Sequence, residues 1–221
     1  MKKQFLFAAF TMLSFFAMAQ SQPSFGVRAG VTSSNMQGDA VNNLKSMLDF
    51  TNGMVSTNSR TGFYGGASAS IPLGQNFSVE PGLYYSQKGY EMQGDFAIKG
   101  LDFLGANAKA KLNTQYIDLP LLLKADMNGF QVFAGPQISY LAKADLKTTA
   151  GALGINLFSR TMDATDNFNR WDAAITGGVG YQFTNGINIR ASYDHGLSKV
   201  DAAQNVESYN RSFKVGIGMN F

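Results

Sequence analysis

Few side chains of this 221-residue chain are suited to covalent chemistry. The chain has no cysteine, which excludes a thiol nucleophile, a thiolate metal site and a disulfide scaffold. It has one histidine, His195, so a zinc site built on several imidazoles is excluded and only one positioned imidazole base is available. His195 falls in a predicted strand, at a position whose side chain points away from the polar face. This favours a polar side chain at the membrane interface over a catalytic base. We therefore expect no catalytic residue and a non-enzymatic protein.

Oxygen ligands and phosphate-binding loops are equally scarce. Asp163, Asp166 and Asn167 could chelate calcium, but their spacing is not that of an EF-hand, and a solvated polar loop explains them more simply. There is no G-x-G-x-x-G or Walker pattern, and Gly177 and Gly178 fall in a predicted strand, where glycine eases curvature. The sequence thus predicts no cofactor and no metal site.

The charge balance does not point to a polyanionic partner. The formal net charge is +3, and two of the positive charges, Lys2 and Lys3, lie in a segment that we expect to be removed. Lys and Arg do not cluster on one face, which argues against nucleic-acid binding.

The first nineteen residues have the pattern of a secretory signal peptide. A positive start, MKK, precedes the largely apolar residues 4–19, and residues 17–19 (AMA) fit an A-x-A cleavage site. We predict cleavage after Ala19, so that residues 20–221 form the mature domain. No other part of the chain has about 18 consecutive apolar residues, which excludes an ordinary membrane-spanning helix.

The rest of the chain alternates with period two rather than 3.6, which indicates strands. In each candidate strand one face is apolar, and the other mixes Gly, Ser, Thr, Asn, Gln and charged residues. The eight candidate strands cover residues 25–33, 62–71, 77–88, 114–126, 130–142, 171–183, 187–197 and 209–221.

The connections between these strands alternate between short and long. Tight turns are expected at residues 72–76, 128–129 and 184–186, where Gly and Asn can adopt positive φ. The long polar stretches are residues 34–61, 89–113, 143–170 and 198–208. This order is typical of an outer-membrane barrel with short periplasmic turns and long extracellular loops. The prediction is an all-β fold: an eight-stranded antiparallel up-and-down transmembrane β-barrel in the cell outer membrane.

Aromatic residues on the apolar faces support a transmembrane barrel over a soluble sandwich. They form two groups about one strand length apart, as the two membrane interfaces require. The group near the short turns and chain ends is Phe25, Phe77, Phe130, Phe183 and Phe221, and the group near the long loops is Phe63, Tyr85, Tyr140, Trp171 and Phe213.

Several segments resemble a known family. They are SVEPGLYYSQKGY (78–90), YIDLPLLLK (116–124) and VFAGPQISYL (132–141), together with a C-terminal strand ending in Phe221. Over residues 20–221 the chain resembles the PorT-like outer-membrane β-barrel family of Gram-negative bacteria, often labelled "porin family" or "outer membrane protein beta-barrel domain". The resemblance implies a barrel without catalytic residues, and its namesake is associated with protein secretion and gliding. FKVGIGMNF (213–221) also resembles the signal by which the barrel-assembly machinery recognises its clients.

Nine charged residues have inward parity, and their charges nearly balance. An eight-stranded barrel is just filled by its side chains, whereas water-filled pores need about 16–18 strands. We therefore expect layered ion pairs that plug the lumen, and the alternative is a proton or ion path through them. The nine residues are Arg28, Glu80, Lys88, Asp118, Lys124, Asp172, Arg190, Asp194 and Lys214.

The long loops are the expected place for binding. Residues 40–50 could form a short amphipathic helix, and residues 150–158 (AGALGINLF) are unusually apolar for a loop, either through packing over the barrel mouth or as a partner surface. The favoured function is a component for interaction, envelope integrity or secretion; a narrow passive channel and a membrane-embedded enzyme are the alternatives. The expected partners are outer-membrane lipid, the assembly machinery during insertion, and a secretion-machinery or extracellular partner at the loops.

Three prolines fall in consecutive predicted strands at similar depth: Pro81, Pro120 and Pro136. A closed barrel has no edge strand to accommodate proline, so each one removes a ladder hydrogen bond or sits at a bulge. The band either adds curvature and fixes register through bulges, or forms a weak seam in the wall.

Overall fold

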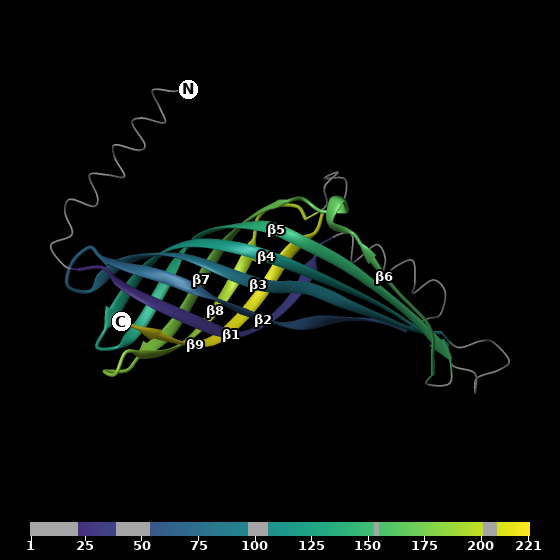
Figure 1. Cartoon of the computed structure of the whole chain (residues 1–221), viewed down its shortest axis with the longest axis horizontal. Coiled ribbons are helices and arrows are strands. Elements are labelled where there is room, and N and C mark those ends of the chain that lie inside the picture. Colours follow the sequence, from purple (N-terminus) through teal and green to yellow (C-terminus); the bar gives the residue numbers. More distant parts are fainter. Residues whose placement is uncertain (1–21, 39–53, 97–105, 153–154, 201–206) are drawn as a thin grey trace, which may run out of the picture.

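The computed structural model describes residues 22–38, 54–96, 106–152, 155–200 and 207–221. Over these ranges the chain is almost entirely β-strand, and Figure 1 shows the strands wound into one long barrel. The strands are β1 (Ser24–Gln37), β2 (Met54–Pro72), β3 (Phe77–Phe96), β4 (Ala106–Met127), β5 (Phe130–Ala152), β6 (Ile155–Asp163), β7 (Trp171–Gln182), β8 (Ile187–Gly196) and β9 (Tyr209–Asn220). A 3₁₀ turn, η1 (Thr165–Asn167), follows β6. Within these residues, no helix is long and apolar enough to cross a membrane.

The barrel is closed and antiparallel, with eight strands in its wall. Each of β1 to β5 pairs with the next, β5 continues to β7, and the ring closes through β8, β9 and back to β1. At the junction the Phe25 N–H donates to the Phe221 carbonyl (3.1 Å), and the Phe221 N–H donates to the Phe25 carbonyl (2.8 Å). The predicted fold class is confirmed.

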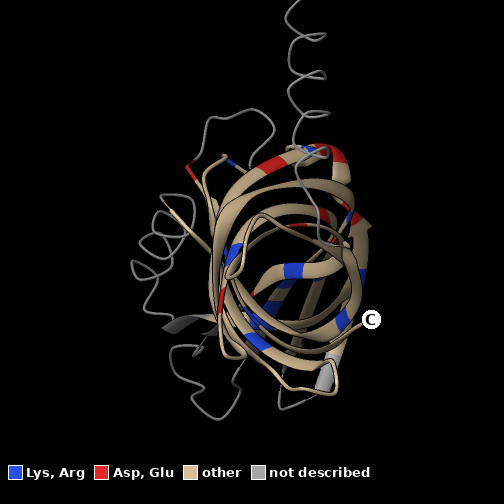
Figure 2. Cartoon of the chain, turned by 90° about the vertical axis from the view of Figure 1, so that its left-hand side faces the viewer, with Lys and Arg blue, Asp and Glu red and all other residues tan. Residues whose placement is uncertain are grey.

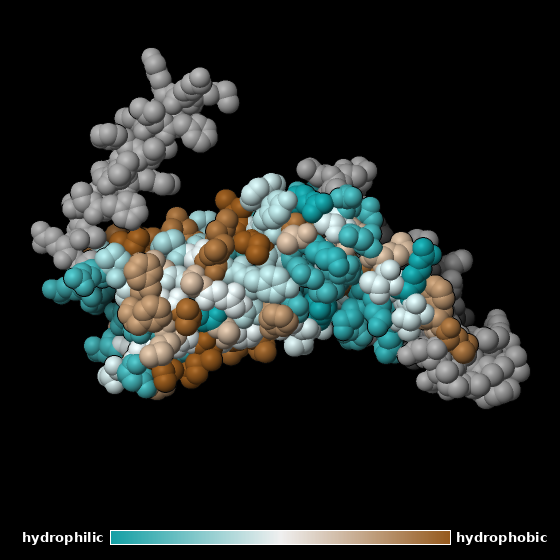
Figure 3. Space-filling view, in the orientation of Figure 1, coloured by the Kyte–Doolittle hydropathy of each residue, from teal (hydrophilic) through white to brown (hydrophobic). Residues whose placement is uncertain are grey.

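The predicted alternation decides which side chains face inward. In β9, Ser212 and Lys214 are buried while Phe213 is 50% and Ile217 58% exposed. The same parity around the ring puts an apolar surface on the outside of the barrel, which Figure 3 shows as brown side chains over the barrel half of the molecule. This exterior is suited to hydrocarbon, and the polar side chains are collected in the lumen.

The short turns behave as predicted. Asn128 and Gly129 both have positive φ (54° and 91°), as the two-residue hairpin turn between β4 and β5 requires. Gly186, the last residue of the three-residue turn at 184–186, also has positive φ (87°). The start of β1 and the end of β9 also lie at this end of the barrel, on the left of Figure 1. We call it the turn end and the opposite one the loop end.

The extent of the long loops was predicted wrongly. Residues 89–113 and 143–170 are largely strand, because β3, β4 and β5 continue well past the barrel and β6 folds back on β5. Phe96 pairs with Ala106, and Ala106 pairs with Ala152. The backbone N–H and C=O groups of these strands therefore bond to one another even far from the closed barrel. We call this extension of β3, β4 and β5, together with β6, the projecting sheet; it runs to the lower right in Figure 1. The helix expected at 40–50 lies outside the described residues.

The ladders of the described strands change register in β2–β3, β4–β5 and β5–β6, and they are interrupted at the prolines. Between β4 and β5, Gln115 pairs with Lys143 but Tyr116 with Leu141, so Ala142 is an extra residue. Near the prolines the register is unchanged, yet two consecutive residue pairs are missing from each of three ladders. The missing pairs are Ala69–Pro81 and Ser70–Glu80, Gly82–Pro120 and Leu83–Leu119, and Leu121–Pro136 and Leu122–Gly135. The prolines therefore do not form bulges.

Candidate functional site

The lumen holds all nine charged residues whose inward parity the sequence predicted. The exposed fraction of each is between 0% for Asp118 and 8% for Arg28. Figure 2, which looks along the barrel from the turn end, shows basic positions set into the wall around the opening. Buried charges are tolerated only when paired, so their partners decide what the lumen can do.

Glu80 of β3 is the centre of the cluster nearer the turn end. Arg190 of β8 binds both its carboxylate oxygens, with Nη1 to Oε1 at 2.5 Å and Nη2 to Oε2 at 2.8 Å. Lys124 Nζ lies 3.2 Å from Oε2 and Arg28 Nη1 lies 3.6 Å from Oε1. We call these four residues the Glu80 cluster; it has three cations and one carboxylate.

The surplus cations of the Glu80 cluster are held by neutral acceptors. Arg28 donates to the Tyr84 hydroxyl (2.9 Å), and Lys124 donates to the Ser70 hydroxyl (3.1 Å). Arg190 Nε donates to Gln131 Oε1 (3.2 Å). These contacts fix the side chains without neutralising them.

A second cluster lies nearer the loop end, around Asp118 of β4. Lys88 and Lys214 each place Nζ 3.0 Å from an Asp118 oxygen, and Lys214 also lies 2.7 Å from Asp194. Asp172, on the same side of the lumen, accepts from Asn210 (2.7 Å). With two cations and three carboxylates, this Asp118 cluster carries the opposite excess to the Glu80 cluster.

A cavity of about 40 Å³ lies between the two clusters. Its charged lining comes from both, with Arg28 and Arg190 on one side and Asp194 and Lys214 on the other. The apolar and aromatic part of its lining is Tyr64, Tyr84, Pro120, Leu122 and Phe133. We call this space the chamber.

An apolar cap, which was not predicted from the sequence, covers the loop end of the lumen. Met36, Leu112 and Val200 form a buried cluster against which Tyr90, Leu146 and Phe168 pack. A neighbouring cluster of Tyr116, Leu141 and Ala144 also contacts Phe168. The inward parity of Tyr90 and Leu112 signalled part of this cap, but the bulge at Ala142 shifts Ala144 and Leu146 out of phase with the rest of β5.

The apolar segment at 150–158 does not supply the cap. Leu157 is 73% and Phe158 52% exposed on the projecting sheet, and Met162 further along β6 is 48% exposed. The packing over the barrel mouth expected for this segment therefore involves other residues.

The other candidate residues do not come together as a reactive site. His195 is exposed on the outer face beside Tyr193. Asp163 accepts from the backbone N–H (2.8 Å) and hydroxyl (2.5 Å) of Thr165, which hold the pKa of its carboxyl below the usual value. Asp166 pairs with Arg170 instead (2.8 Å). Across the described ranges, no three His, Cys, Asp or Glu side chains form a group that could hold a metal ion.

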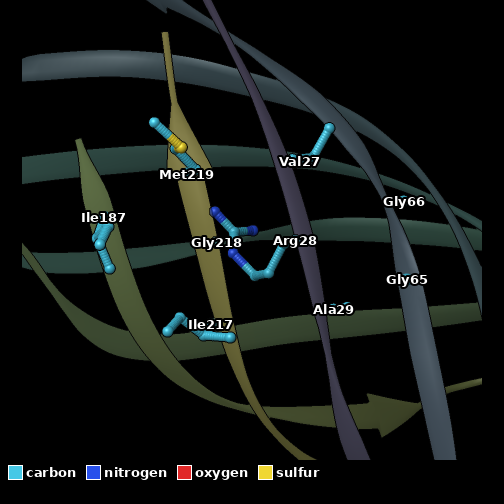
Figure 4. A pocket seen from close by; sticks show the side chains of 9 residues that line it. All are labelled: Val27, Arg28, Ala29, Gly65, Gly66, Ile187, Ile217, Gly218 and Met219. Atoms are coloured by element: carbon cyan, nitrogen blue, oxygen red, sulfur yellow. The ribbon is translucent and has the colours of Figure 1, made fainter.

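A shallow hollow of about 520 Å³ lies on the outer wall over β9, β1 and β2. It exists because Ala29 and Gly65 leave the surface low beside Ile217 and Met219, as Figure 4 shows. In the same view Arg28 leaves β1 on the β9 side. Apart from Arg28, whose side chain is buried, the lining is apolar or glycine, and membrane hydrocarbon can fill the hollow from outside.

The geometry agrees with a comparison against known families. Residues 18–202 match the family described as "Outer membrane protein beta-barrel domain". The chain belongs to this family. Its place is therefore the outer membrane, as the apolar exterior requires.

Solved structures of similar shape are also outer-membrane barrels. Neisserial surface protein A is 15% identical, with 91% of this chain and 100% of that one covered and a TM-score of 0.48. Ail, the attachment invasion locus protein of Yersinia pestis, is 14% identical with the same coverage and a TM-score of 0.41. OprG of Pseudomonas aeruginosa is 16% identical over 92% and 98% of the two chains, with a TM-score of 0.42. No curated protein matches the chain.

Proposed function

We propose that this chain is a non-enzymatic outer-membrane barrel that conducts no solute along its axis and presents its projecting sheet outside the cell. The observation that carries the proposal is the sequence of barriers across the lumen: the Glu80 cluster, the Asp118 cluster and the apolar cap around Leu112. A water-filled path would have to separate buried ion pairs and wet an apolar cluster, both of which cost free energy.

Single-channel recording in planar bilayers tests the closed axis. The purified barrel is expected to give no steady conductance, and a Leu112→Asp variant, which puts a charge into the cap, is expected to give at most brief openings because both charge clusters remain. A stable open level for the wild type would favour the narrow passive channel instead.

The projecting sheet supports an interaction role. Strands need only about 9–11 residues to cross a bilayer, whereas β3, β4 and β5 have 20, 22 and 23. The surplus length carries Leu157 and Phe158 away from the barrel with half or more of each side chain exposed, in a part of the molecule that Figure 3 shows as largely hydrophilic. Exposed apolar side chains on a polar surface are typical of a contact surface.

The interaction role can be tested on whole cells. A photoreactive amino acid at Leu157 is expected to cross-link to a partner, and one at Leu73 in a short turn serves as the matched control at the opposite end. A partner from the secretion machinery would support the PorT-like assignment, whereas an extracellular ligand would support adhesion. The double variant Leu157→Ser, Phe158→Ser is expected to insert normally and to lose the cross-linked partner.

A further inference from the structure

The three ladder gaps form one continuous strip of weakened wall. Pro81 pairs with Leu121, which follows Pro120, and Pro120 pairs with Gln137, which follows Pro136. The gaps therefore lie side by side across β2, β3, β4 and β5. We call this strip the proline seam.

The seam has a direct physical cause. Each gap contains one proline, which has no N–H to donate across it. The ladder joining β5 to β7 is continuous from Phe130 to Tyr140, and the ladder joining β8 to β9 is continuous from Ile187 to His195. Opening the wall at the seam therefore breaks fewer hydrogen bonds than opening it on the opposite side of the barrel.

The seam lies at the depth of the membrane interior. Pro81 is midway along β3 between Phe77 and Tyr85, which belong to the two aromatic groups. On the outer face Leu83, Leu119 and Leu121 are 56%, 45% and 48% exposed, so hydrocarbon covers the seam from outside.

The chamber lies directly behind the seam. Pro120 and Leu122 belong to the seam and also line the chamber, so no further layer separates the two. Tyr84 and Phe133 line the chamber next to Pro120 and Leu122. Together these side chains form an apolar path from the membrane hydrocarbon to the chamber.

The charged lining of the chamber is mainly cationic. Arg28, Arg190 and Lys214 line the chamber against one carboxylate, Asp194. The Glu80 cluster beside it also has two more cations than carboxylates. An anion that entered the chamber would lose its hydration, which is costly in a membrane interior. The surplus cations would compensate for this cost by pairing with it.

We propose that the proline seam is a lateral portal through which a single-chain anionic amphiphile of the fatty-acid class binds. Its carboxylate occupies the chamber against Arg28 and Arg190, and its tail passes between β3 and β4, beside Pro120, into the bilayer. A volume of about 40 Å³ is of the size of a small polar headgroup, so the tail requires the seam to part. This site goes beyond the proposed function, because the axis of the barrel stays closed.

Photolabelling in nanodiscs tests the portal. The probe is a C16 fatty acid with a diazirine close to its carboxylate, and the comparison probe is the fatty alcohol with the diazirine at the same carbon. After proteolysis and mass spectrometry, the acid is expected to label the inward Leu122 and Phe133, with at least fivefold less labelling by the alcohol.

A disulfide across the seam gives the decisive variant, because the chain has no native cysteine. Leu83→Cys with Leu119→Cys bridges the missing pair, and oxidation is expected to reduce chamber labelling at least tenfold, with recovery on reduction. Ala191→Cys with Val215→Cys bridges a paired position on the opposite wall and is expected to change nothing.

Three results would overturn the portal. They are acid labelling confined to the outward residues Leu119 and Leu121, equal chamber labelling by acid and alcohol, and chamber labelling that is the same in the oxidised and reduced Leu83–Leu119 pair. Because oxidised and reduced forms of one variant are compared, misfolding of the variant cannot imitate the expected result.

Discussion

Glu80 and Arg190 form a two-point ion pair across the lumen, from β3 to β8, with N–O distances of 2.5 and 2.8 Å. The two residues are far apart in the sequence and sit on non-neighbouring strands, so their contact joins opposite parts of the wall. Arg28 and Lys124 approach the same carboxylate, which makes Glu80 the shared counter-ion of three buried cations.

Removing this counter-ion is expected to destabilise the barrel. Glu80→Ala leaves three buried cations without their carboxylate, at a cost of about 3–5 kcal/mol where desolvation is complete. The measurement is the free energy of unfolding in urea with detergent or lipid. The matched control is Asp166→Ala, whose side chain is 95% exposed and which should stay within about 0.5 kcal/mol of the wild type. Equal effects of the two changes would contradict the paired interior.

Gly135 is expected to tolerate no side chain. A Cβ there would lie 2.1 Å from the Leu121 carbonyl oxygen, which is backbone and cannot move aside cheaply. Gly135→Ala should therefore cost about 1–3 kcal/mol and lower the yield of folded barrel. Gly177→Ala is the control on a neighbouring strand, because the nearest atom to its Cβ is 3.9 Å away. Heat-modifiable migration on gels reports both outcomes.

Phe221 is expected to be needed for efficient assembly. Its backbone exchanges two hydrogen bonds with Phe25 where the barrel closes, and by resemblance it belongs to the assembly signal. Deleting it should reduce the amount in the outer membrane and increase periplasmic degradation, measured by fractionation and blotting. Leu73→Ala, in an exposed turn, is the control. Normal levels of the deletion variant in the outer membrane would show that Phe221 is needed neither for barrel closure nor for recognition by the assembly machinery.

The link between β6 and η1 is expected to weaken in acid. Thr165 holds the pKa of Asp163 below its usual 3.8, so the interaction is fully present above that pH and is lost as the pH falls through the lowered pKa. Amide exchange of β6, corrected for intrinsic pH dependence, should therefore be less protected near pH 3 than at pH 6. In Thr165→Val the difference in protection between the two pH values should shrink, since the hydroxyl donor is absent. If the difference is unchanged, titration of Asp163 is not its cause.

Cleavage after Ala19 is expected in the exported protein, because residues 17–19 fit the cleavage pattern. Protein from the envelope should begin at Gln20 by N-terminal sequencing or intact mass. Ala19→Arg is expected to block processing and retain the precursor. A wild-type protein that still carries residues 1–19 would contradict the signal peptide.

The sequence predicted the ring and the lumen well, and their extension poorly. Parity alone placed Glu80, Asp118 and Lys214 inside, because in a barrel each strand must present one face to lipid and one to the interior. The same polarity that suggested a loop at 89–113 belongs to strands outside the membrane, where no lipid selects apolar residues. The cap was missed because Met36, Leu112 and Val200 lie in stretches predicted as loops, and because the bulge at Ala142 reverses the parity of the end of β5. Which cations gather at which carboxylate depends on shear between strands, which one sequence does not reveal.

The pairing of β1 with β9 has a kinetic consequence. Val27 lies beside Met219, so the ladder that closes the barrel joins residues that synthesis separates by nearly the whole chain. Until β9 is in place, β1 presents an unpaired edge that could join another strand. Folding must therefore be slow compared with that of proteins rich in local contacts, and it must finish only after the chain has been released. The unpaired first strand needs protection during that interval, which makes dependence on holding chaperones a property of the topology itself.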